Sequence, residues 1–260
     1  MLLTTMQVTG SNYICTDYKK GWQSVGPFII FTDMRFIEVC ATSLFDVEQA
    51  VEGGASRVEL CSALELGGIT PSYGLIKQVL ERCRIKTNIL IRARGGDFVY
   101  TKEEIDTMIE DIRMCKRLGV NGVVIGALTS DGDIDIEAVR RMVDAAKPEL
   151  EVTFHRAFDR ASNPHEALEQ IISLGCDTLL TSGQQEESAE YGVKLLAELV
   201  KQSNSRITIM PGKGVRTSNI DYIEKISGAT QFHSTARSAK YSNIHTDKEI
   251  VAQMSHKSLK

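Results

Sequence analysis

The sequence predicts an α/β fold, a single (β/α)8 TIM barrel with a short irregular N-terminal arm. One phrase, in which a helix ends at a glycine and an apolar strand follows, recurs at 53–61, 118–126, 174–182 and 227–235. Glycine ends a helix at little cost because it tolerates the left-handed conformation. Eight apolar strands alternate with amphipathic helices, as a TIM barrel requires. A doubly wound sheet is the alternative, but no glycine-rich fingerprint follows the first strand.

The eight expected strands cover residues 36–40, 57–61, 88–93, 122–127, 151–155, 178–182, 206–210 and 231–235. Amphipathic helices are expected near 44–53, 72–83, 102–118, 135–146, 164–174, 188–200 and 218–226, with a final helix from about Asp247 to His256. Helix starts are marked by a cap at Thr70-Pro71, a capping box at 101–104 and an Asn-Pro-x-Glu start at 163–166. This alternation predicts parallel strands joined by crossover helices.

The composition is that of an ordinary globular protein, with 42% hydrophobic and 25% charged residues. A net charge of −4 gives no electrostatic footprint for nucleic acid or for a membrane surface. No apolar run approaches the roughly 20 residues of a membrane span. The six cysteines are scattered without a Cys-x-x-Cys pair. They therefore indicate reduced thiols in a cytosolic or nuclear protein, not a disulfide framework or a zinc ribbon.

Residues 1–33 differ from the rest of the chain. They show no clear period, and Lys19 and Lys20 follow the apolar start, unlike the order of a signal peptide. We therefore expect two parts, a poorly ordered arm over 1–33 and a barrel domain over 34–260. Because Met34 stands just before the first strand, we also expect it to be the functional start and the arm to be dispensable.

Two strands end in the same phrase, an apolar residue, a glutamate, an apolar residue and a cysteine. Glu38 shares one face of the first strand with Cys40, because side chains alternate along a strand. Glu59 shares a face of the second strand with Cys61 in the same way. The glutamates suit acid–base work or salt bridges to arginines, and the cysteines suit thiolate ligands for Cu(I) or small buried hydrophobes. The stagger of neighbouring strands leaves the distance between the cysteines open.

Other strands also end in polar residues: Arg92, Arg94 and Asp97 after the third, His155, Arg156 and Asp159 after the fifth, and His233 and Arg237 after the eighth. Chemistry in a TIM barrel sits at these carboxyl ends, so we expect the side chains to rim a polar cavity. The alternative is that some point outward or form a structural ion-pair network. His155 is a candidate acid, base or ligand because the ordinary pKa of histidine lies near ~6.5.

The turn after the seventh strand reads Pro-Gly-Lys-Gly over 211–214. Phosphate commonly binds beside this turn and the next one in TIM barrels, and the backbone N–H groups of Gly212 and Gly214 suit an anion there. The candidates for acid–base chemistry are Glu38, Glu59, His155 and Asp159. The candidates for substrate or anion binding are Arg92, Arg94, Asp97, Arg156, Gly212, Gly214, His233 and Arg237.

Eight phrases in order resemble the CutC family, the copper homeostasis protein family: EVCATS, GGASRVELC, LGGITPS, IRARGGDFVY, VIGALTSDGDID, VTFHRAFD, LLTSG and FHSTARS, over about 34–240. The resemblance implies a TIM barrel that is cytoplasmic and homo-oligomeric. It also implies a role in copper tolerance, with Cu(I) held by Cys40 and Cys61. The chain departs from the family at Lys213, where a further glycine is more usual, and in a short stretch before the last helix.

The residues and the resemblance leave two hypotheses for the function. The first is a copper homeostasis protein that binds Cu(I) through the barrel-mouth cysteines. The second is a TIM-barrel enzyme of lyase, isomerase or hydrolase type, in which a glutamate or His155 transfers a proton within a small anionic, sugar-like or phosphorylated metabolite. The second accounts better for the arginines, which suit carboxylates or phosphates and which Cu(I) has little need of. Copper is the one cofactor implied, no organic cofactor is indicated, and the expected partner is a copper ion or a small anion.

Overall fold

The computed structural model describes residues 6–9, 12–15 and 34–256, which fall into two units. In the first unit, β1 (Met6–Thr9) pairs antiparallel with β2 (Asn12–Cys15). The sequence indicated no strands in this segment. The other residues expected to form the arm lie outside the described ones, so the order of the arm and its dispensability stay predictions.

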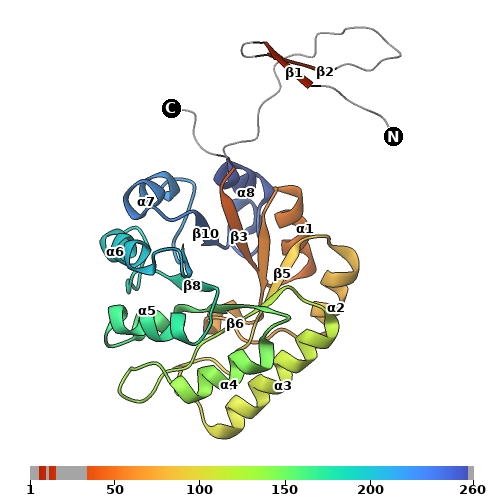
Figure 1. The fold of residues 1–260 in the computed structure, drawn as a ribbon. Coiled ribbons are helices and arrows are strands. Elements are labelled where there is room, and N and C mark those ends of the chain that lie inside the picture. Colours follow the sequence, from red (N-terminus) through yellow and green to blue (C-terminus); the bar gives the residue numbers. More distant parts are fainter. Residues whose placement is uncertain (1–5, 10–11, 16–33, 257–260) are drawn as a thin grey trace. The chain divides into compact units, whose positions relative to one another are not determined.

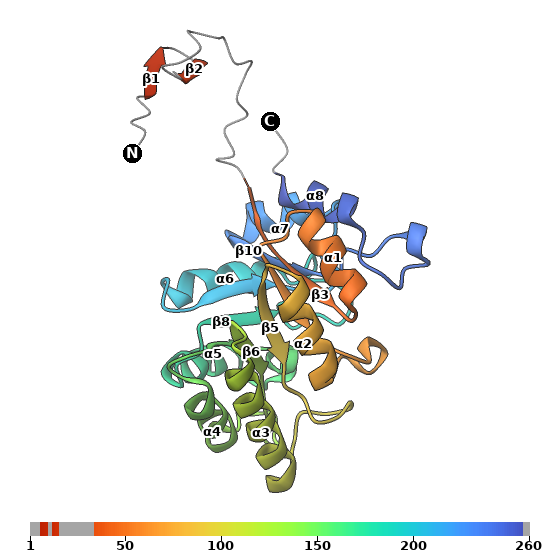
Figure 2. The same ribbon diagram turned by 90° about the vertical axis from the view of Figure 1, so that its right-hand side faces the viewer.

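The second unit is a (β/α)8 barrel, as predicted, in which parallel strands alternate with helices (Figure 1, Figure 2). The strands are β3 (Phe36–Ala41), β4 (Arg57–Leu60), β5 (Lys86–Leu90), β6 (Gly122–Ile125), β7 (Glu151–Phe154), β8 (Thr178–Thr181), β9 (Thr208–Pro211) and β10 (Gln231–Ser234). The helices are α1 (Leu44–Glu52), α2 (Tyr73–Arg82), α3 (Lys102–Leu118), α4 (Ile136–Ala146), α5 (Pro164–Ser173), α6 (Val193–Ser203), α7 (Ile220–Ser227) and α8 (Lys248–Ser255). Short 3-10 turns are η1 (Leu64–Leu66), η2 (Arg156–Arg160) and η3 (Ala239–Tyr241).

Consecutive strands of the barrel are neighbours in the sheet, whose order is β10-β3-β4-β5-β6-β7-β8-β9. The end strands β9 and β10 lie against each other, so the sheet is nearly closed. The Ser234 hydroxyl at the end of β10 donates to the Val215 carbonyl after β9, at 2.8 Å. The register places Glu38 of β3 opposite His233 of β10 and opposite Arg57 of β4. Strand pairing therefore brings these three side chains together inside the barrel.

The predicted capping box at the start of α3 is confirmed. The Glu104 N–H donates to the Thr101 hydroxyl at 3.3 Å, and the Thr101 N–H donates to the Glu104 carboxylate at 2.9 Å. The predicted cap of α2 is wrong, because the Ser72 hydroxyl, and not Thr70, accepts the Leu75 N–H at 3.2 Å. Thr70 instead accepts a backbone N–H from the end of β5.

Helix α6 begins at Val193, later than the predicted start at residue 188. Gly192 packs against the loop after β8, where a Cβ atom on it would lie 2.2 Å from the Ser182 carbonyl oxygen. The Ala189 N–H donates to a carbonyl of the loop after β9, at 2.9 Å. The residues before α6 are thus held in turns that connect two loops at the carboxyl end of the sheet.

The main apolar core lies between the strands and the helices. Outward-facing residues such as Val39, Val58 and Ile89 are fully buried there. A second, smaller apolar cluster lies apart from it and consists of Cys40, Cys61, Leu90 and Val124. Because side chains alternate along each strand, the apolar outer faces leave polar residues and the cysteines on the inner faces.

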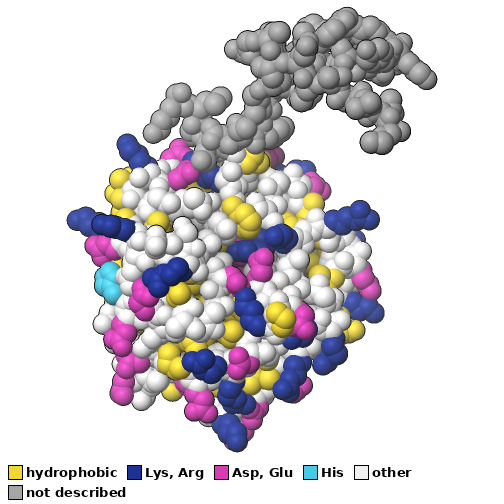
Figure 3. Space-filling model, viewed as in Figure 1, with side chains coloured by type: hydrophobic (Ala, Val, Ile, Leu, Met, Phe, Trp, Pro, Cys, Tyr) yellow, Lys and Arg dark blue, Asp and Glu magenta, His cyan; other side chains and the backbone are white. Residues whose placement is uncertain are grey.

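Charged side chains of both signs are interspersed over the face of the molecule that Figure 3 shows. This distribution is that of an ordinary protein surface. Among the helices of the described residues, none is both long and apolar enough to cross a membrane.

We predict that Arg57→Met strongly destabilises the barrel. Arg57 is 4% exposed, and its Nε donates to the fully buried carboxylate of Glu38 at 2.5 Å. The substitution leaves that carboxylate buried without its cation, and breaking a buried pair in this way costs about 3–5 kcal/mol. Urea unfolding measures the loss.

Arg82→Met is the matched control for this prediction. Arg82 pairs with Glu48 on the surface, and exposed pairs contribute about 0–1 kcal/mol. An equal loss of stability in the two variants would contradict the role given to the buried pair.

Candidate functional site

A cavity of about 1410 Å³ lies at the carboxyl ends of the barrel strands. Its lining includes most of the predicted site residues: Cys40, Glu59, Cys61, Arg92, His155, Arg156, Asp159, Gly214, His233 and Arg237. The predicted residues outside the lining are Glu38, Arg94, Asp97 and Gly212. The structure thus brings the first group together, and the roles expected of these residues stay predictions.

The thiols of Cys40 and Cys61 touch, with 3.6 Å between their sulfur atoms. Both residues are buried, and each comes from the end of one of two neighbouring strands, β3 and β4. Leu90 and Val124 pack beside them. The sequence left this distance open, and the register of β3 against β4 sets it.

A buried chain of polar groups runs beside the thiols. The Nε of Arg57 donates to one carboxylate oxygen of Glu38 at 2.5 Å, and Nδ1 of His233 contacts the other at 2.8 Å. The Nε2 of His233 lies 3.6 Å from the carboxylate of Glu59. Of the two alternatives for the glutamates, Glu38 does form a salt bridge to an arginine, but the partner is Arg57 on the adjacent strand and not Arg92 or Arg94.

Burial and charge set the protonation of this chain. Burial raises the pKa of Glu38, but the hydrogen bond with His233 and the charge of Arg57 outweigh burial, so the pKa lies below its usual value. Burial lowers the pKa of His233, but the hydrogen bond with Glu38 and the charge of Glu59 outweigh it, so the pKa is raised. Burial also raises the pKa of Glu59, and the charge of His233 offsets only part of this rise. Of the two buried carboxyls, Glu59 is therefore the one that takes up a proton more readily.

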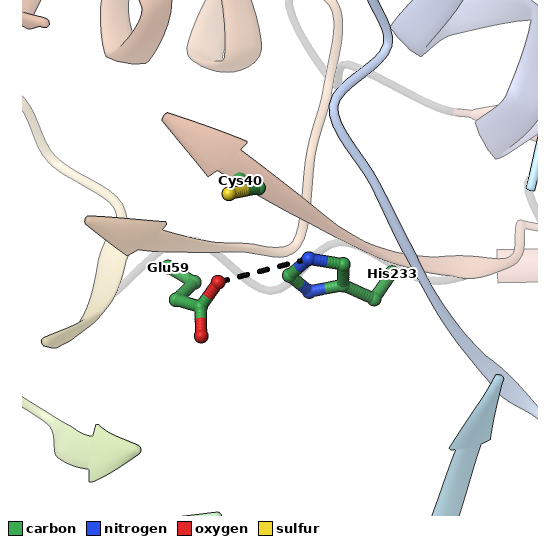
Figure 4. A group of neighbouring side chains, drawn as sticks. All are labelled: Cys40, Glu59 and His233. Atoms are coloured by element: carbon green, nitrogen blue, oxygen red, sulfur yellow. Dashed lines mark ion pairs between the residues drawn. The ribbon is translucent and has the colours of Figure 1, made fainter. Parts of the chain in front are cut away.

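Cys40, Glu59 and His233 form one cluster (Figure 4). One ligand atom from each lies within 4.8 Å of the others. The Nδ1 of His233 contacts Glu38, which leaves Nε2 to face Glu59. A carboxylate behind a histidine orients the ring and strengthens it as a metal ligand. With Cys61 beside Cys40, the donors are two sulfurs, an imidazole and a carboxylate, a set that fits a soft or borderline metal ion.

We call Cys40, Cys61, Glu59 and His233 the cavity floor. The sequence grouped the two cysteines as ligands but assigned His233 to anion binding. The missing signal is barrel closure, which places the last strand beside the first. Counting inward positions on those two strands would have put His233 next to Glu38.

His155 lies on another part of the cavity lining. Its Nδ1 accepts the Ala157 N–H at 3.1 Å. Burial, with the charge of Arg92, lowers the pKa of His155 to about 3. The ring is therefore neutral at physiological pH and suits a hydrogen-bond donor better than the general base that the sequence suggested.

The side chains of the two arginines after β5 make different contacts. Arg92 is 4% exposed and donates to the carbonyls of Leu66 and Gly68, each at 3.0 Å. Arg94 turns away from the cavity, with Nε donating to Glu104 at 2.5 Å. Asp97 also pairs with Arg94, at 3.0 Å. The expected pair of guanidiniums in the cavity is therefore wrong, and Arg92 alone of the two lines it.

Asp159 is fully engaged as an acceptor. Its carboxylate accepts from Arg156 at 2.9 Å, from the Thr181 hydroxyl at 2.6 Å and from the Ser182 N–H at 2.9 Å. These contacts connect η2 to the loop after β8. They support an anchoring role for Asp159 and leave its expected acid–base role a prediction.

The loop after β9 fits an anion less simply than the sequence suggested. The N–H of Gly212 donates to the Thr181 carbonyl at 2.9 Å, so it is not available to a ligand as predicted. Gly214 does line the cavity. Between them, Lys213 has a φ of 74°, in the left-handed region that glycine enters more easily. This conformation explains why a glycine suits the position.

Cationic side chains outnumber anionic ones around the cavity opening. The cations are Arg156, Arg160, Lys213, Arg216 and Arg237. The anions are Glu65, Glu186 and Asp159, the last paired with Arg156. Sequence reasoning missed Arg160 and Arg216, although both follow barrel strands by a few residues. A cavity opening with an excess of positive charge attracts a small anion.

Known proteins resemble this chain over most of the barrel. The CutC family model matches residues 35–238. The chain belongs to the CutC family. A CutC family protein of Parabacteroides distasonis is 53% identical over 218 residues, which cover 84% of this chain and 89% of the relative. One of Chromobacterium violaceum is 48% identical over 203 residues, covering 78% and 81%.

Solved structures agree with the family and the fold. The CutC protein of Streptococcus agalactiae, described provisionally as a copper homeostasis protein, gives a TM-score of 0.73 at 38% identity, covering 78% of this chain and 99% of that one. Phosphoribosylanthranilate isomerase of Thermotoga maritima gives a TM-score of 0.56 at 12% identity, covering 85% and 96%. The second likeness shows the barrel fold alone. The predicted family and fold class are confirmed.

We predict that the two cavity histidines differ in charge near neutral pH. With a pKa of about 3, His155 stays neutral from about pH 5 to about pH 8, whereas the raised pKa of His233 keeps that ring protonated to a higher pH than usual. Long-range ¹H–¹⁵N NMR of the imidazole nitrogens measures both. A His155 ring that titrates near its ordinary value of ~6.5 would contradict the assignment.

The lowered pKa of His155 also predicts how the stability of the fold depends on pH. Below about pH 6.5 the unfolded chain protonates His155 and the folded chain does not, so this residue lowers stability as the pH falls from about 6.5 towards 3. His155→Gln is expected to reduce that acid sensitivity in thermal unfolding.

Proposed function

We propose that this CutC family protein serves copper homeostasis by binding Cu(I), as its cargo, between the sulfurs of Cys40 and Cys61. The contact of these sulfurs, 3.6 Å apart on the cavity lining, carries the proposal. Thiolates are soft ligands that select Cu(I). Both cysteines stand at the ends of paired strands, so the sheet and not a mobile loop holds them together.

Glu59 and His233 would assist Cu(I) binding at the floor. The hydrogen bond to Cys61 and burial raise the pKa of Cys40 well above its usual value, so the Cys40 thiol holds its proton until a metal ion displaces it. Glu59 lies beside Cys40, and its raised pKa suits it to accept one proton. His233 offers Nε2 as a further ligand once the ring has lost a proton. Cu(I) affinity should therefore rise with pH.

We predict that Cys40→Ser/Cys61→Ser abolishes stoichiometric Cu(I) binding and leaves the barrel folded. Serine keeps the size of the side chain but offers no soft ligand. An anaerobic competition titration against a Cu(I) chelator measures binding at two pH values, and circular dichroism checks the fold.

Cys83→Ser/Cys176→Ser is the matched control for copper binding, because neither cysteine lines the cavity. It should bind Cu(I) as the wild type does. If the floor double variant binds as much Cu(I) as the wild type, copper is incidental to these cysteines.

A different observation favours a second function, acid–base catalysis on a small anionic metabolite. Glu59 and His233 are buried, lie 3.6 Å apart and line a cavity whose opening is cationic. Burial moves the pKa of Glu59 towards neutral pH, where a general acid or base works best. We propose that Glu59 would transfer the proton in a lyase, isomerase or hydrolase type of reaction on a sugar-like or phosphorylated ligand.

We predict that Glu59→Gln lowers turnover at least ~100-fold, because the amide cannot exchange the proton. Mass spectrometry of a panel of sugar phosphates and hydroxy acids incubated with the protein measures turnover. Glu65→Gln, an exposed carboxylate at the opening, serves as the control. A wild-type protein that converts no member of the panel would contradict the enzyme proposal.

We also propose, from the family resemblance, that the protein works in the cytoplasm as a homo-oligomer. Both statements rest on the resemblance, and no contact among the described residues bears on them.

A further inference from the structure

Two buried N–H groups on the cavity lining have no hydrogen-bond acceptor within the described part of the chain. They are Nε of Arg92 and Nε2 of His155. The two residues are 4% and 5% exposed, and both line the cavity. Buried polar groups in folded proteins nearly always have a partner. Two orphaned donors in one cavity therefore call for an acceptor from outside the chain.

The Nε2 atom of His155 can only donate a hydrogen bond. Its Nδ1 accepts the Ala157 N–H, so the proton of the neutral ring is on Nε2. The ring packs closely against Gly126, where a Cβ atom would lie 2.5 Å from the imidazole, and the Ala157 N–H orients it. The donor is thus held in place before any ligand arrives.

Arg92 also has a fixed position, and its Nε is the side-chain nitrogen that has no hydrogen-bond partner among the described residues. Its Nη1 and Nη2 atoms donate to backbone carbonyls, the latter to Gly96 at 2.8 Å. Carbonyls orient the guanidinium but do not neutralise it. Arg94 pairs with two carboxylates, whereas among the ion pairs of residues 34–256 Arg92 has none. The Nε–H of Arg92 is therefore a charged donor without an acceptor among the described residues, and it could make a charge-assisted hydrogen bond to a ligand.

Phe98 packs against both donor-bearing residues. Its ring centroid lies 4.7 Å from Cζ of Arg92 and 5.0 Å from the centroid of the His155 ring. A third donor-bearing residue, Arg160, has its Cζ 5.3 Å from the same centroid. Phe98 itself lines the cavity. One aromatic side chain thus supports a small group of donors around it.

We propose that Arg92 and His155, supported by Phe98, form a subsite for an oxyanion, a carboxylate or phosphate group of a small metabolite. Two donors without a neighbouring acceptor select a group that can only accept. The cationic opening draws such a group in. The buried carboxylate of the cavity, Glu59, contacts the floor residues instead.

This oxyanion subsite is separate from the thiols of the floor and does not require copper. It deepens the second proposed function by naming the ligand class, and it rests on that function only for what happens to the bound ligand. Binding and turnover are therefore tested by different measurements.

Isothermal titration calorimetry with inorganic phosphate and with acetate tests the subsite in the full chain. We expect the wild type to bind at least one of them saturably and His155→Leu to bind it about tenfold more weakly or worse, because one donor is lost. Arg92→Lys keeps the charge but lacks the Nε–H and should weaken binding as well. Arg94→Lys is the matched control and should bind like the wild type.

Each outcome of the titration either identifies the ligand class of the subsite or refutes the subsite. Binding of phosphate alone indicates a phosphate-bearing ligand, and binding of acetate alone indicates a carboxylate-bearing one. Equal affinity in the wild type and His155→Leu, or no saturable binding of either probe, overturns the subsite.

Where the variants do not fold, the ¹H–¹⁵N signal of His155 Nε2 in the wild type gives the answer. A saturable shift on addition of phosphate or acetate supports the subsite, and no shift refutes it. Retained anion binding without turnover would refute the enzyme proposal and leave this subsite standing.

Discussion

The barrel depends on one buried carboxylate, that of Glu38, which neighbouring strands share. Arg57 from β4 binds one oxygen, and His233 from β10 contacts the other. An isolated charge in such a place is strongly unfavourable, so each of the three groups needs the others. β10 is an end strand of the sheet order, and this carboxylate connects it to the first barrel strand. Cys40 lies two residues after Glu38 on β3, and Glu59 lies two residues after Arg57 on β4. The same strand register therefore sets the geometry of the cavity floor.

The cavity combines three environments that are chemically distinct. The floor has two thiols and the carboxyl of Glu59, the group around Phe98 has donors without acceptors, and the opening has mostly cationic side chains. A metal ion and an organic anion would bind different atoms of this one space. Binding of a metal ion and binding of an anion need not exclude each other, since a ligand held by Arg92 and His155 leaves the thiols unoccupied.

The fold could be predicted from the sequence because its signals are local: glycine after a helix, an apolar strand and strict alternation. Alternation also predicted that Glu38 and Cys40 share an inner face. It failed for Arg92 and Arg94, because β5 ends at Leu90 and the two arginines lie in a loop where period two no longer applies. The contact between His233 and Glu38, on the last and first barrel strands, was missed as well. Placing His233 at the floor requires barrel closure, and no periodicity within a segment contains that information.

Gly126 and His155 limit the substitutions that are possible at each other's position. The imidazole occupies the space that a side chain directly after β6 would need, since a Cβ atom at Gly126 would lie 2.5 Å from the ring. Any variant that gains a side chain at Gly126 must first lose or turn the histidine. The reverse order, losing His155 while Gly126 remains, leaves a void but no collision. Substitution of His155 must therefore come before substitution of Gly126. A relative with alanine at position 126 should lack a histidine at position 155.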